Sequence, residues 1–514
     1  MVRVEGFFIL HMNRREFLKA GGAVMVMSTT LGGTVRAADP KADAPIAIGS
    51  RRELMVDDYL IDRMVGKVEL RMHHPIPREV AITMDKPWEG NGSMYMTVFQ
   101  DGKLYRMYYR GVHVVYTREG FSEPHEQVTC YAESQDGIHW TKPELGLVDF
   151  GGSKQNNIIL KGPGITDNFT PFKDTNPQCK ADERYKALGG GGGGLVAMIS
   201  SDGIHWRKLR EQPVITKGLF DSQNLAFWDS VRGEYREYHR DARDGRDIRT
   251  CTSKDFLAWS EPVFLNYSPS RVSELYTNQV TPYPRAPHLF LGFPTRYIER
   301  GWSPSMEALP QLDYRRVRAA KSLREGTALT DGMLMTSRDG LNFKVWPESF
   351  IRPGLRTKYN WFYGDNYQSW GLIETESHMT AAPKEFSFFA SESYCQGDYC
   401  WWRRFTMRID GFVSVQAPLS GGEFITKPLV FEGGDLALNF STGAAGRIRI
   451  EIQDAAGKPL PGFALGDGPE IFGDALDRVA PWKQGRLLKQ LSGKPVRLRF
   501  ELRDADLYAF QFLA

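Results

Sequence analysis

The stretch Ser134-Gln135-Asp136-Gly137-Ile138-His139-Trp140 introduces a turn motif, Ser-x-Asp-Gly-x-x-aromatic, that recurs along this 514-residue chain. It returns at 200–206 and 337–343, and without the glycine at 253–259. Asp-Gly between strand-like segments predicts a tight turn, because glycine reaches positive φ at little cost and aspartate caps the turn. Copies about 50 to 85 residues apart are typical of four-stranded propeller blades with loops of variable length.

Five successive units carry strand-like stretches around this motif, and the aromatic that ends it is expected to pack between neighbouring sheets. Each unit has the strand, turn, strand, strand order of a blade. One short helix is expected at 312–323. The last hundred residues alternate apolar and polar side chains, as half-buried antiparallel sheets do. We therefore predict an all-β fold: a five-bladed β-propeller over 50–410, in which 53–72 completes a blade, followed by a β-sandwich over 411–514.

The N-terminal residues 1–38 have the order of an export signal. Asn13-Arg14-Arg15-Glu16-Phe17-Leu18-Lys19 precedes an apolar run at 20–31 and small residues at Ala37 and Ala38. The paired arginines resemble a twin-arginine signal, and the apolar run is too short to span a bilayer permanently. The expected partner during export is the twin-arginine translocase, and the expected location is periplasmic or secreted, without stable membrane insertion.

Beyond residue 38 the chain holds 60 basic and 60 acidic residues, so no basic field exists to bind nucleic acid. Hydrophobic residues make up 41% of the sequence, which is ample for a core. The five cysteines form no metal-ligand pattern, and their odd number argues against a full disulfide framework. Cys395 and Cys400 could bridge a loop, whereas the other three are expected to be buried thiols.

A carboxylate recurs near the inner strand of every unit, where a propeller funnel would open. Like charges at close range raise one pKa and leave another group ionised. Cleavage of a glycosidic bond needs that division of roles. For each acid the alternative is a turn former or strand cap. The five acids are Glu89, Asp174, Asp221, Glu274 and Asp365.

Side chains near these acids supply candidate contacts to a sugar. Aromatic rings could stack on sugar faces, amides and guanidinium groups could bind hydroxyl or acidic groups, and no cofactor or metal is expected beyond a possible structural calcium ion. The aromatic candidates are Trp88, Tyr95, Trp228, Tyr276, Trp361, Tyr363 and Trp370, and the polar ones Asn176, Asn224, Asn278, Arg240 and Arg296.

Two stretches carry a family resemblance that covers about residues 85–405. Phe172-Lys173-Asp174-Thr175-Asn176-Pro177, followed by Glu183-Arg184-Tyr185-Lys186-Ala187, and Phe227-Trp228-Asp229 with Gly233-Glu234-Tyr235 resemble the five-bladed propeller glycoside hydrolases of families 32 and 43. The resemblance implies that Asp174 orients the substrate and tunes the acid. It further implies Glu89 as base or nucleophile and Asp221 as general acid.

The leading interpretation is therefore an exported glycoside hydrolase that cleaves a poly- or oligosaccharide by paired-carboxylate acid/base catalysis. One alternative is a non-catalytic carbohydrate-binding propeller, whose acids hold hydroxyl groups or calcium. Another is a glycoside phosphorylase, which needs Arg240 and Arg296 to converge near the acids. Geometry discriminates, because catalytic carboxyl groups lie about 5 to 9.5 Å apart, so Asp174 and Asp221 must share one end of the propeller.

Overall fold

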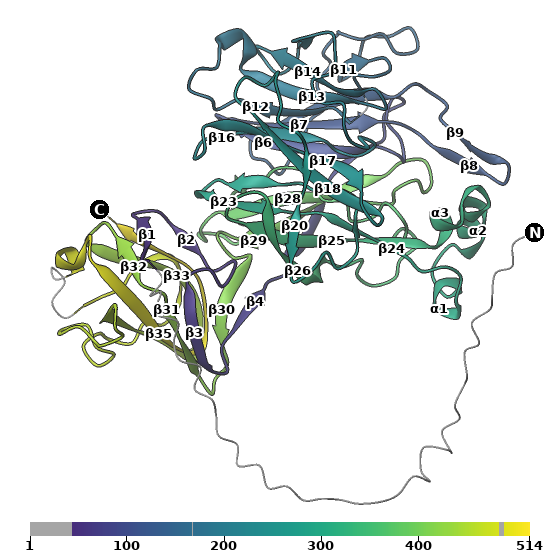
Figure 1. The fold of residues 1–514 in the computed structure, drawn as a ribbon. Helices are drawn as coiled ribbons and strands as arrows, with labels where there is room; N and C mark the ends of the chain where they lie inside the picture. The colour runs from purple at the N-terminus through teal and green to yellow at the C-terminus, as the bar shows by residue number, and fades with distance from the viewer. Residues whose placement is uncertain (1–43, 167, 483–487, 514) are drawn as a thin grey trace, which may run out of the picture. The chain divides into compact units, whose positions relative to one another are not determined.

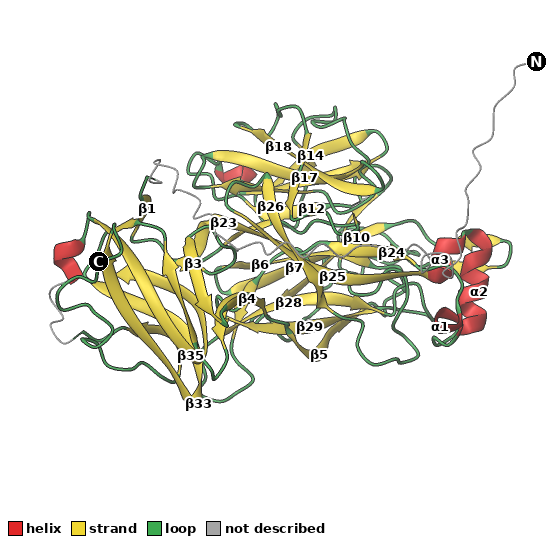
Figure 2. Ribbon diagram, turned by 60° about the horizontal axis from the view of Figure 1, so that its bottom comes forward, coloured by secondary structure: helices red, strands yellow, loops and turns green. Residues whose placement is uncertain are grey.

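Strands dominate the computed structural model, which describes residues 44–166, 168–482 and 488–513 (Figure 2). The predicted export signal at 1–38 lies outside these residues. The helical segments are α1 (Pro304–Glu307), α2 (Leu312–Lys321), α3 (Leu323–Thr327) and the 3₁₀ turns Ala181–Glu183 and Leu488–Leu491. The expected all-β class and the short helix inside the fourth unit are both confirmed.

Four antiparallel sheets of four strands each have the strand order of propeller blades. The first is β6 (Met94–Asp101), β7 (Leu104–Gly111), β10 (Val128–Ser134) and β11 (Ile158–Lys161). The second is β12 (Thr170–Lys173), β13 (Tyr185–Gly191), β14 (Gly194–Ser200) and β15 (Arg207–Lys208). The third is β16 (Leu225–Asp229), β17 (Glu234–Ala242), β18 (Arg246–Ser253) and β19 (Val263–Phe264), and the fifth is β27 (Ile373–Thr375), β28 (Glu385–Glu392), β29 (Trp401–Arg408) and β5 (Ile76–Thr83).

The fourth predicted unit is an enlarged sheet of seven strands. Its members β22 (Thr281–Tyr283), β23 (Ala286–Gly292), β25 (Ala328–Ser337) and β26 (Asn342–Ile351) keep the blade order. The added strands are β20 (Asn266–Ser268), β21 (Glu274–Leu275) and β24 (Thr295–Glu299). Because β25 is long enough to pair with both β23 and β24, the sheet outgrows a blade. The described residues therefore contain four regular blades and not the five predicted.

Aromatic rings link each sheet to the next in a closed cycle. Trp206, in the turn motif of the second sheet, lies 6.5 Å from Tyr108 of the first. Phe350 of the enlarged sheet lies 5.9 Å from Phe388 of the fifth. Equivalent contacts join the third sheet to the second, the enlarged sheet to the third and the first to the fifth: Phe256–Phe172 at 5.7 Å, Phe343–Tyr238 at 6.3 Å and Trp140–Phe389 at 5.8 Å. This cycle is a propeller-like arrangement. The expected packing of the motif's aromatic ring is confirmed in three copies, whereas in the degenerate copy Phe256, at the glycine position, makes the contact and Trp259 packs on Phe256.

All four copies of the turn motif use the same hydrogen bonds. In the first copy Ser134 Oγ accepts from the Gly137 amide at 2.9 Å, and Asp136 Oδ1 accepts from the Ile138 and His139 amides at 2.8 Å. The degenerate copy places Phe256 at φ 67°, where the others have glycine. Each motif follows the third strand of its sheet, so its aspartate lies in a turn between outer strands.

The N-terminal strands belong to the C-terminal sheet, as Figure 1 shows by the purple strands among green and yellow ones. The expectation that 53–72 completes a blade is wrong, because β5 pairs with β29 and does so instead. The predicted propeller range, 50–410, thus includes strands that pair elsewhere. The early strands of the C-terminal sheet are β1 (Ile46–Gly49), β2 (Glu53–Leu54), β3 (Ile61–Gly66) and β4 (Glu69–Met72).

The C-terminal sheet is one hydrogen-bonded network of ten strands in the described residues. Its two long strands, β33 and β35, pair over most of their length, with a register shift between Thr442 and Arg447. Two separate sheets are not found, so the predicted sandwich over 411–514 is not confirmed. Its later strands are β30 (Val413–Ala417), β31 (Gly422–Thr426), β32 (Leu429–Phe431), β33 (Asp435–Asp454), β34 (Asp474–Val479) and β35 (Pro495–Leu513).

A buried polar network connects the inner strands at the centre of the cycle. Gln223 donates to Thr97 Oγ1 at 3.0 Å. Gln279 donates to Gln223 Oε1 at 2.7 Å and to the Gln368 carbonyl at 2.8 Å. All four side chains are buried. The network therefore ties the inner strands of four sheets together.

Candidate functional site

Asp174 and Asp221 lie at opposite ends of the inner strands. Asp221 precedes β16 and contacts Arg240, whereas Asp174 follows β12 and contacts Tyr235. Tyr235 and Arg240 are five residues apart on β17, a span of about 17 Å at 3.4 Å per residue. The predicted pairing of these acids is therefore wrong. The error was one of register, because the acid that precedes β12 in the sequence is Asp167, which lies outside the described residues.

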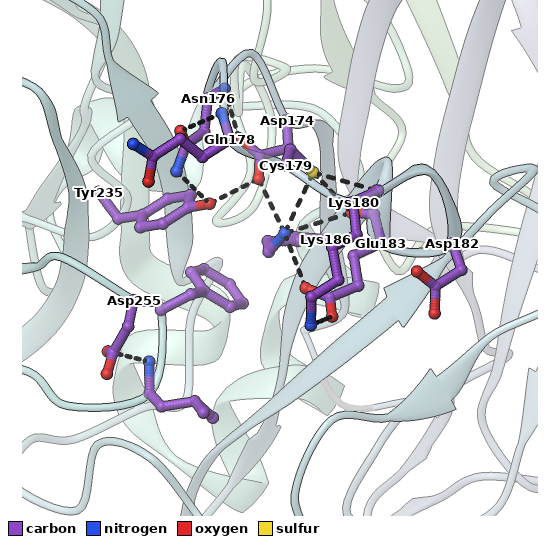
Figure 3. Close-up of polar contacts among 12 residues, drawn as sticks. Asp174, Asn176, Gln178, Cys179, Lys180, Asp182, Glu183, Lys186, Tyr235 and Asp255 are labelled. Carbon is purple, nitrogen blue, oxygen red and sulfur yellow. Dashed lines mark hydrogen bonds and ion pairs between the residues drawn. The ribbon is translucent and has the colours of Figure 1, made fainter.

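Asp174 is part of a buried clamp between the second and third sheets (Figure 3). Its Oδ2 accepts from Lys186 Nζ at 2.8 Å and from the Tyr235 hydroxyl at 2.6 Å. Asn176 belongs to the same clamp, since it donates to the Tyr235 hydroxyl at 3.1 Å. Burial and the hydrogen bond to Asp174 raise the pKa of Tyr235. Every contact of the Asp174 carboxylate is thus taken up by the fold.

Glu89 is enclosed in the first sheet and faces no funnel. Its side chain is 0% exposed and accepts from the Tyr109 hydroxyl and from Lys142 Nζ, each at 2.6 Å. Trp88 beside it donates from its indole to Asn157 at 2.7 Å. The carboxylate of Glu89 is therefore closed to a ligand, whereas that of Asp221 is 80% exposed.

Other predicted residues have structural contacts. Asp365 is buried, where its carboxylate accepts from two main-chain amides, and burial raises its pKa to about 7. Asn224 and Asn278 donate to main-chain carbonyls. Arg296 forms a bidentate pair with Asp331 at 2.6 and 2.9 Å.

Arg296 also does not meet Arg240 near the acids, as phosphorolysis would require. Neighbouring residues of a strand point to opposite faces, and Tyr297 points toward Arg246, so Arg296 faces the other side of β24. Arg240 and Arg296 therefore do not converge, as the phosphorylase alternative would require.

Tyrosines from several sheets gather at the end where the inner strands begin. Rings of Tyr276 and Tyr363 lie 6.0 Å apart, and Tyr276 and Tyr367 lie 5.2 Å apart. Tyr297 lies 5.5 Å from Tyr363. Burial raises the pKa of Tyr95, Tyr363 and Tyr367 well above the usual value, so their hydroxyl groups stay neutral donors. We name this group the tyrosine belt: Tyr95, Tyr276, Tyr297, Tyr363, Tyr367 and Tyr394.

Two predicted acids, Asp221 and Glu274, each pair with an arginine whose guanidinium lies near the Tyr276 ring of the belt. Arg240 lies 3.2 Å from Asp221, and its guanidinium carbon is 5.1 Å from the Tyr276 ring centroid. Arg246 lies 2.8 Å from Glu274 and 5.2 Å from the same centroid. The Asp221 side chain is 80% exposed and that of Glu274 is 30% exposed. These two acids are therefore open to a ligand, unlike Asp174, Glu89 and Asp365.

The backbone around this end is strained. Tyr95 has φ 58°, Gln279 has φ 44° and Asn366 has φ 62°. In β6 the register shifts between Met94 and Thr97, which is the mark of a bulge at Tyr95. Left-handed backbone at bulky residues costs about 1–3 kcal/mol each and clusters at functional sites. The strain is consistent with a site at the belt.

Arg246, which the sequence analysis did not single out, is held by a hairpin turn. The turn between β17 and β18 contains Asp244 and Gly245, both with positive φ. A Cβ on Gly245 would lie 2.7 Å from Glu274 Cδ, so a larger residue there would displace that carboxylate. The Asp-Gly pair lies between two segments in which apolar and polar residues alternate, which is a hairpin signal that could have pointed to Arg246.

The opposite end of the inner strands holds a cavity of about 410 Å³. Two predicted aromatic residues, Trp228 and Trp370, line it together with Lys173 and Thr175, the neighbours of Asp174. Five of the seven predicted aromatic residues are thus divided between two ends, since Tyr95, Tyr276 and Tyr363 lie in the belt, whereas Trp361 lines another cavity with Arg296.

The structure also bears on metal ligands, membrane-spanning helices and the possible Cys395–Cys400 bridge. The described residues contain no cluster of three or more His, Cys, Asp or Glu side chains that could hold a metal ion, and the structural calcium stays a prediction. None of the described helices is long and apolar enough to cross a membrane. Cys395 and Cys400 are both free and buried, so the optional bridge between them is absent.

Comparison with known sequences identifies no family. The chain matches no protein-family model. Two proteins of Mycobacterium tuberculosis, from strains CDC 1551 and H37Rv and both described as uncharacterized, are 31% identical to it over 142 residues. That match covers 27% of this chain and 40% of each relative, so the chain spans less than half the length of the curated relatives it matches.

Among solved structures, a glycoside hydrolase has a TM-score of 0.39 at 14% identity, covering 68% of this chain and 95% of its own. A fructofuranosidase from Schwanniomyces occidentalis has a TM-score of 0.35 at 11% identity, covering 84% and 96%. The catalytic domain of an α-L-arabinofuranosidase from Coprinopsis cinerea has a TM-score of 0.36 at 9% identity, covering 65% and 98%. With TM-scores below 0.5, these likenesses decide nothing about function, which rests on the side chains described above.

Proposed function

We propose that this chain is an exported glycoside hydrolase that cleaves a poly- or oligosaccharide at the tyrosine belt. With the enlarged sheet counted as its fourth blade, the propeller has five blades, and 411–514 is an accessory domain. The proposed location is periplasmic or secreted, after passage through the twin-arginine translocase.

One observation carries the proposal: Asp221, which is exposed, and Glu274, which is partly exposed, each contact an arginine that lies against the Tyr276 ring. Glycosidic cleavage uses two carboxyl groups that flank the scissile bond. Tyrosine rings offer an apolar face to a sugar and a hydroxyl group to its oxygens. The site therefore supplies both the reacting groups and a floor for the substrate.

The contacts of the two acids support different roles. Glu274 Oε2 accepts from the Arg246 amide at 3.0 Å and from Arg246 Nη1 at 2.8 Å, which fixes its orientation. We assign Glu274 as base or nucleophile. Asp221 has a single contact at 3.2 Å and is free to turn toward a leaving oxygen, so we assign it as general acid. Asp174 and Glu89 have no catalytic role in this proposal.

The test is hydrolysis of a glycan panel by the wild type, Asp221→Asn and Glu274→Gln. Loss of an acid or base is expected to lower kcat by about 10²–10⁴-fold. Because Asp221 is exposed and Glu274 partly exposed, each variant should stay folded, which its unfolding temperature checks. Glu211→Gln, an exposed acid on another surface, serves as the control.

Two outcomes would overturn the assignment. Full activity of both variants would remove these acids from the reaction. Binding of a glycan by the wild type without any cleavage would favour the alternative of a carbohydrate-binding propeller.

A further inference from the structure

Arg110 of β7 is a cation at the tyrosine belt without an ion-pair partner, since the charge of Glu123 acts on it only from beyond ion-pair distance. Its strand position pairs with Met94 at the start of β6, and its guanidinium carbon lies 4.8 Å from the Tyr95 ring centroid. Nη2 donates to the Gly92 carbonyl at 3.3 Å. Nε is enclosed and has no hydrogen-bond partner in the described part of the chain. Within that same part, no carboxylate lies within 4 Å of Arg110.

The other arginines of the belt do have carboxylate partners. Arg240 contacts Asp221, and Arg246 contacts Glu274. Arg324 of α3, whose guanidinium carbon is 5.6 Å from the Tyr363 ring, lies 3.6 Å from Glu325. A partly buried charge without a partner is costly to the fold. Arg110 retains this unfavourable free energy because it forms no ion pair, which indicates that its partner is a bound ligand.

The guanidinium of Arg110 is also accessible and oriented. Nη1 makes no hydrogen bond among the described residues and, unlike Nε, is not enclosed. The Tyr95 ring below the guanidinium plane holds it by a cation–π contact. Tyr95 is 4% exposed, and its hydroxyl has no hydrogen-bond partner among those residues. Arg110 and Tyr95 thus present free N–H and O–H donors side by side.

We propose that the belt takes an anionic sugar, one that carries a carboxylate or a sulfate group, and that Arg110 binds this group above the Tyr95 ring. The planar fork of arginine matches two oxygens of such an anion and gives charge-assisted hydrogen bonds. This inference rests on the proposed function for the location of the sugar. It adds the substrate class: uronate-containing or sulfated saccharides.

The experiment measures binding by titration calorimetry, with Asp221→Asn in the full chain so that cleavage does not interfere. The probes are matched pairs: uronate oligosaccharides and their methyl esters, and sulfated oligosaccharides and their desulfated forms. We expect one class of acidic probe to bind at least tenfold more tightly than its neutral partner. The difference should shrink at high salt, because screening weakens exposed charge pairs.

Variants of Arg110 then test the residue itself. Arg110→Gln should bring the acidic and neutral probes of that pair to equal affinity, and Arg110→Lys should keep part of the preference. Lys103→Gln, an exposed cation at the β6–β7 turn, should leave it unchanged. Circular dichroism and the unfolding temperature confirm that each variant is folded.

The outcomes separate this inference from the proposed function. An acidic preference that Arg110→Gln abolishes, with no hydrolysis of any glycan, would support the inference and contradict the hydrolase. Hydrolysis of neutral glycans at equal rates by the wild type and Arg110→Gln would do the reverse. The inference fails if no pair shows a preference that depends on Arg110, or if only inorganic phosphate or sulfate binds there.

Discussion

Gly245 shows how one residue without a side chain controls the reach of another. It occupies φ +89° in the β17–β18 turn and lies against the end of the Glu274 side chain. Residues of this kind escape a search for reactive groups, because they carry none. Their effect is nevertheless on the geometry of the proposed site.

Gly245→Ala is expected to lower kcat/KM by about tenfold or more, since the new Cβ would displace the Glu274 carboxylate. The strained backbone should cost about 1 kcal/mol of unfolding free energy as well. Gly233→Ala is the matched control, because Gly233 also has positive φ but nothing lies within 4 Å of its added Cβ. Steady-state kinetics with urea unfolding checks both. Equal activity of the two variants would mean that Glu274 is not held by this turn.

Asp174 and Asp221 show that the type of a residue does not by itself determine its environment. Asp174 and Asp221 are the same residue type, each two residues before an asparagine or glutamine in the sequence. One is buried against Lys186, and the other is 80% exposed beside Arg240. The inner strand of the second unit was predicted to begin a few residues too late, after Asp174. In the structure this strand is β12, which ends at Lys173, so Asp174 follows it. Direction along a strand thus decided which acid faces the belt.

At the scale of elements, the turn motif acts as a repeated connector. Its serine and aspartate cap the turn, its aromatic ring packs on the preceding sheet, and the Gly203 carbonyl of the second copy accepts from the Tyr108 hydroxyl of the first sheet at 3.0 Å. These contacts lie far from the belt in every copy. The motif therefore serves the order of the sheets and not the chemistry.

Asp202→Ala in the second copy should cost about 1–2 kcal/mol of unfolding free energy. Its Oδ1 accepts from the Ile204 and His205 amides at 2.8 and 2.9 Å, and a lost cap of this kind typically has that effect. Asp136→Ala in the first copy should cost a similar amount, since it loses the same bonds. Denaturant unfolding measures both, with activity of the folded protein unchanged. A much larger or unequal loss would contradict the view that the copies are equivalent.

At the scale of the whole molecule, Glu53 joins the C-terminal sheet to the enlarged sheet. Its side chain is fully buried in β2, 2.9 Å from Arg338 after β25 and 3.5 Å from His288 of β23. Burial alone would raise its pKa, but His288 and Arg338 outweigh burial and lower the pKa to about 2. A carboxylate whose pKa is lower in the folded protein than in the unfolded chain stabilises the fold at pH values above its unfolded pKa.

The unfolding free energy should therefore fall as the pH drops from about 4.5 toward 2, by about 3 kcal/mol from this group. Glu53→Gln should remove that part of the acid sensitivity while lowering stability at neutral pH. Urea unfolding across this pH range, followed in the wild type and the variant, is the measurement. Parallel pH curves for the two proteins would show that Glu53 is not the group that titrates.

The repeated motif and the alternation of side chains were sufficient to predict an all-β, propeller-like fold. Both are local, because a turn's hydrogen bonds and a strand's two faces depend on residues close together in the chain. The strand that completes the fifth sheet was not predictable in the same way. β5 and the segment 53–72 have similar patterns, and pairing with β29 selected between them.

The turn motif of Ser134 to Trp140 was thus readable from the sequence by itself, as were the candidate acids that include Asp221 and Glu274. Only the tertiary structure decided which of those acids share an end, because that depends on strand direction and on sheets far apart in the chain. It also brought Arg110 and Arg246 to the tyrosine belt. The sequence determines local geometry through short-range bonds, whereas a site is made by long-range packing that no local pattern encodes.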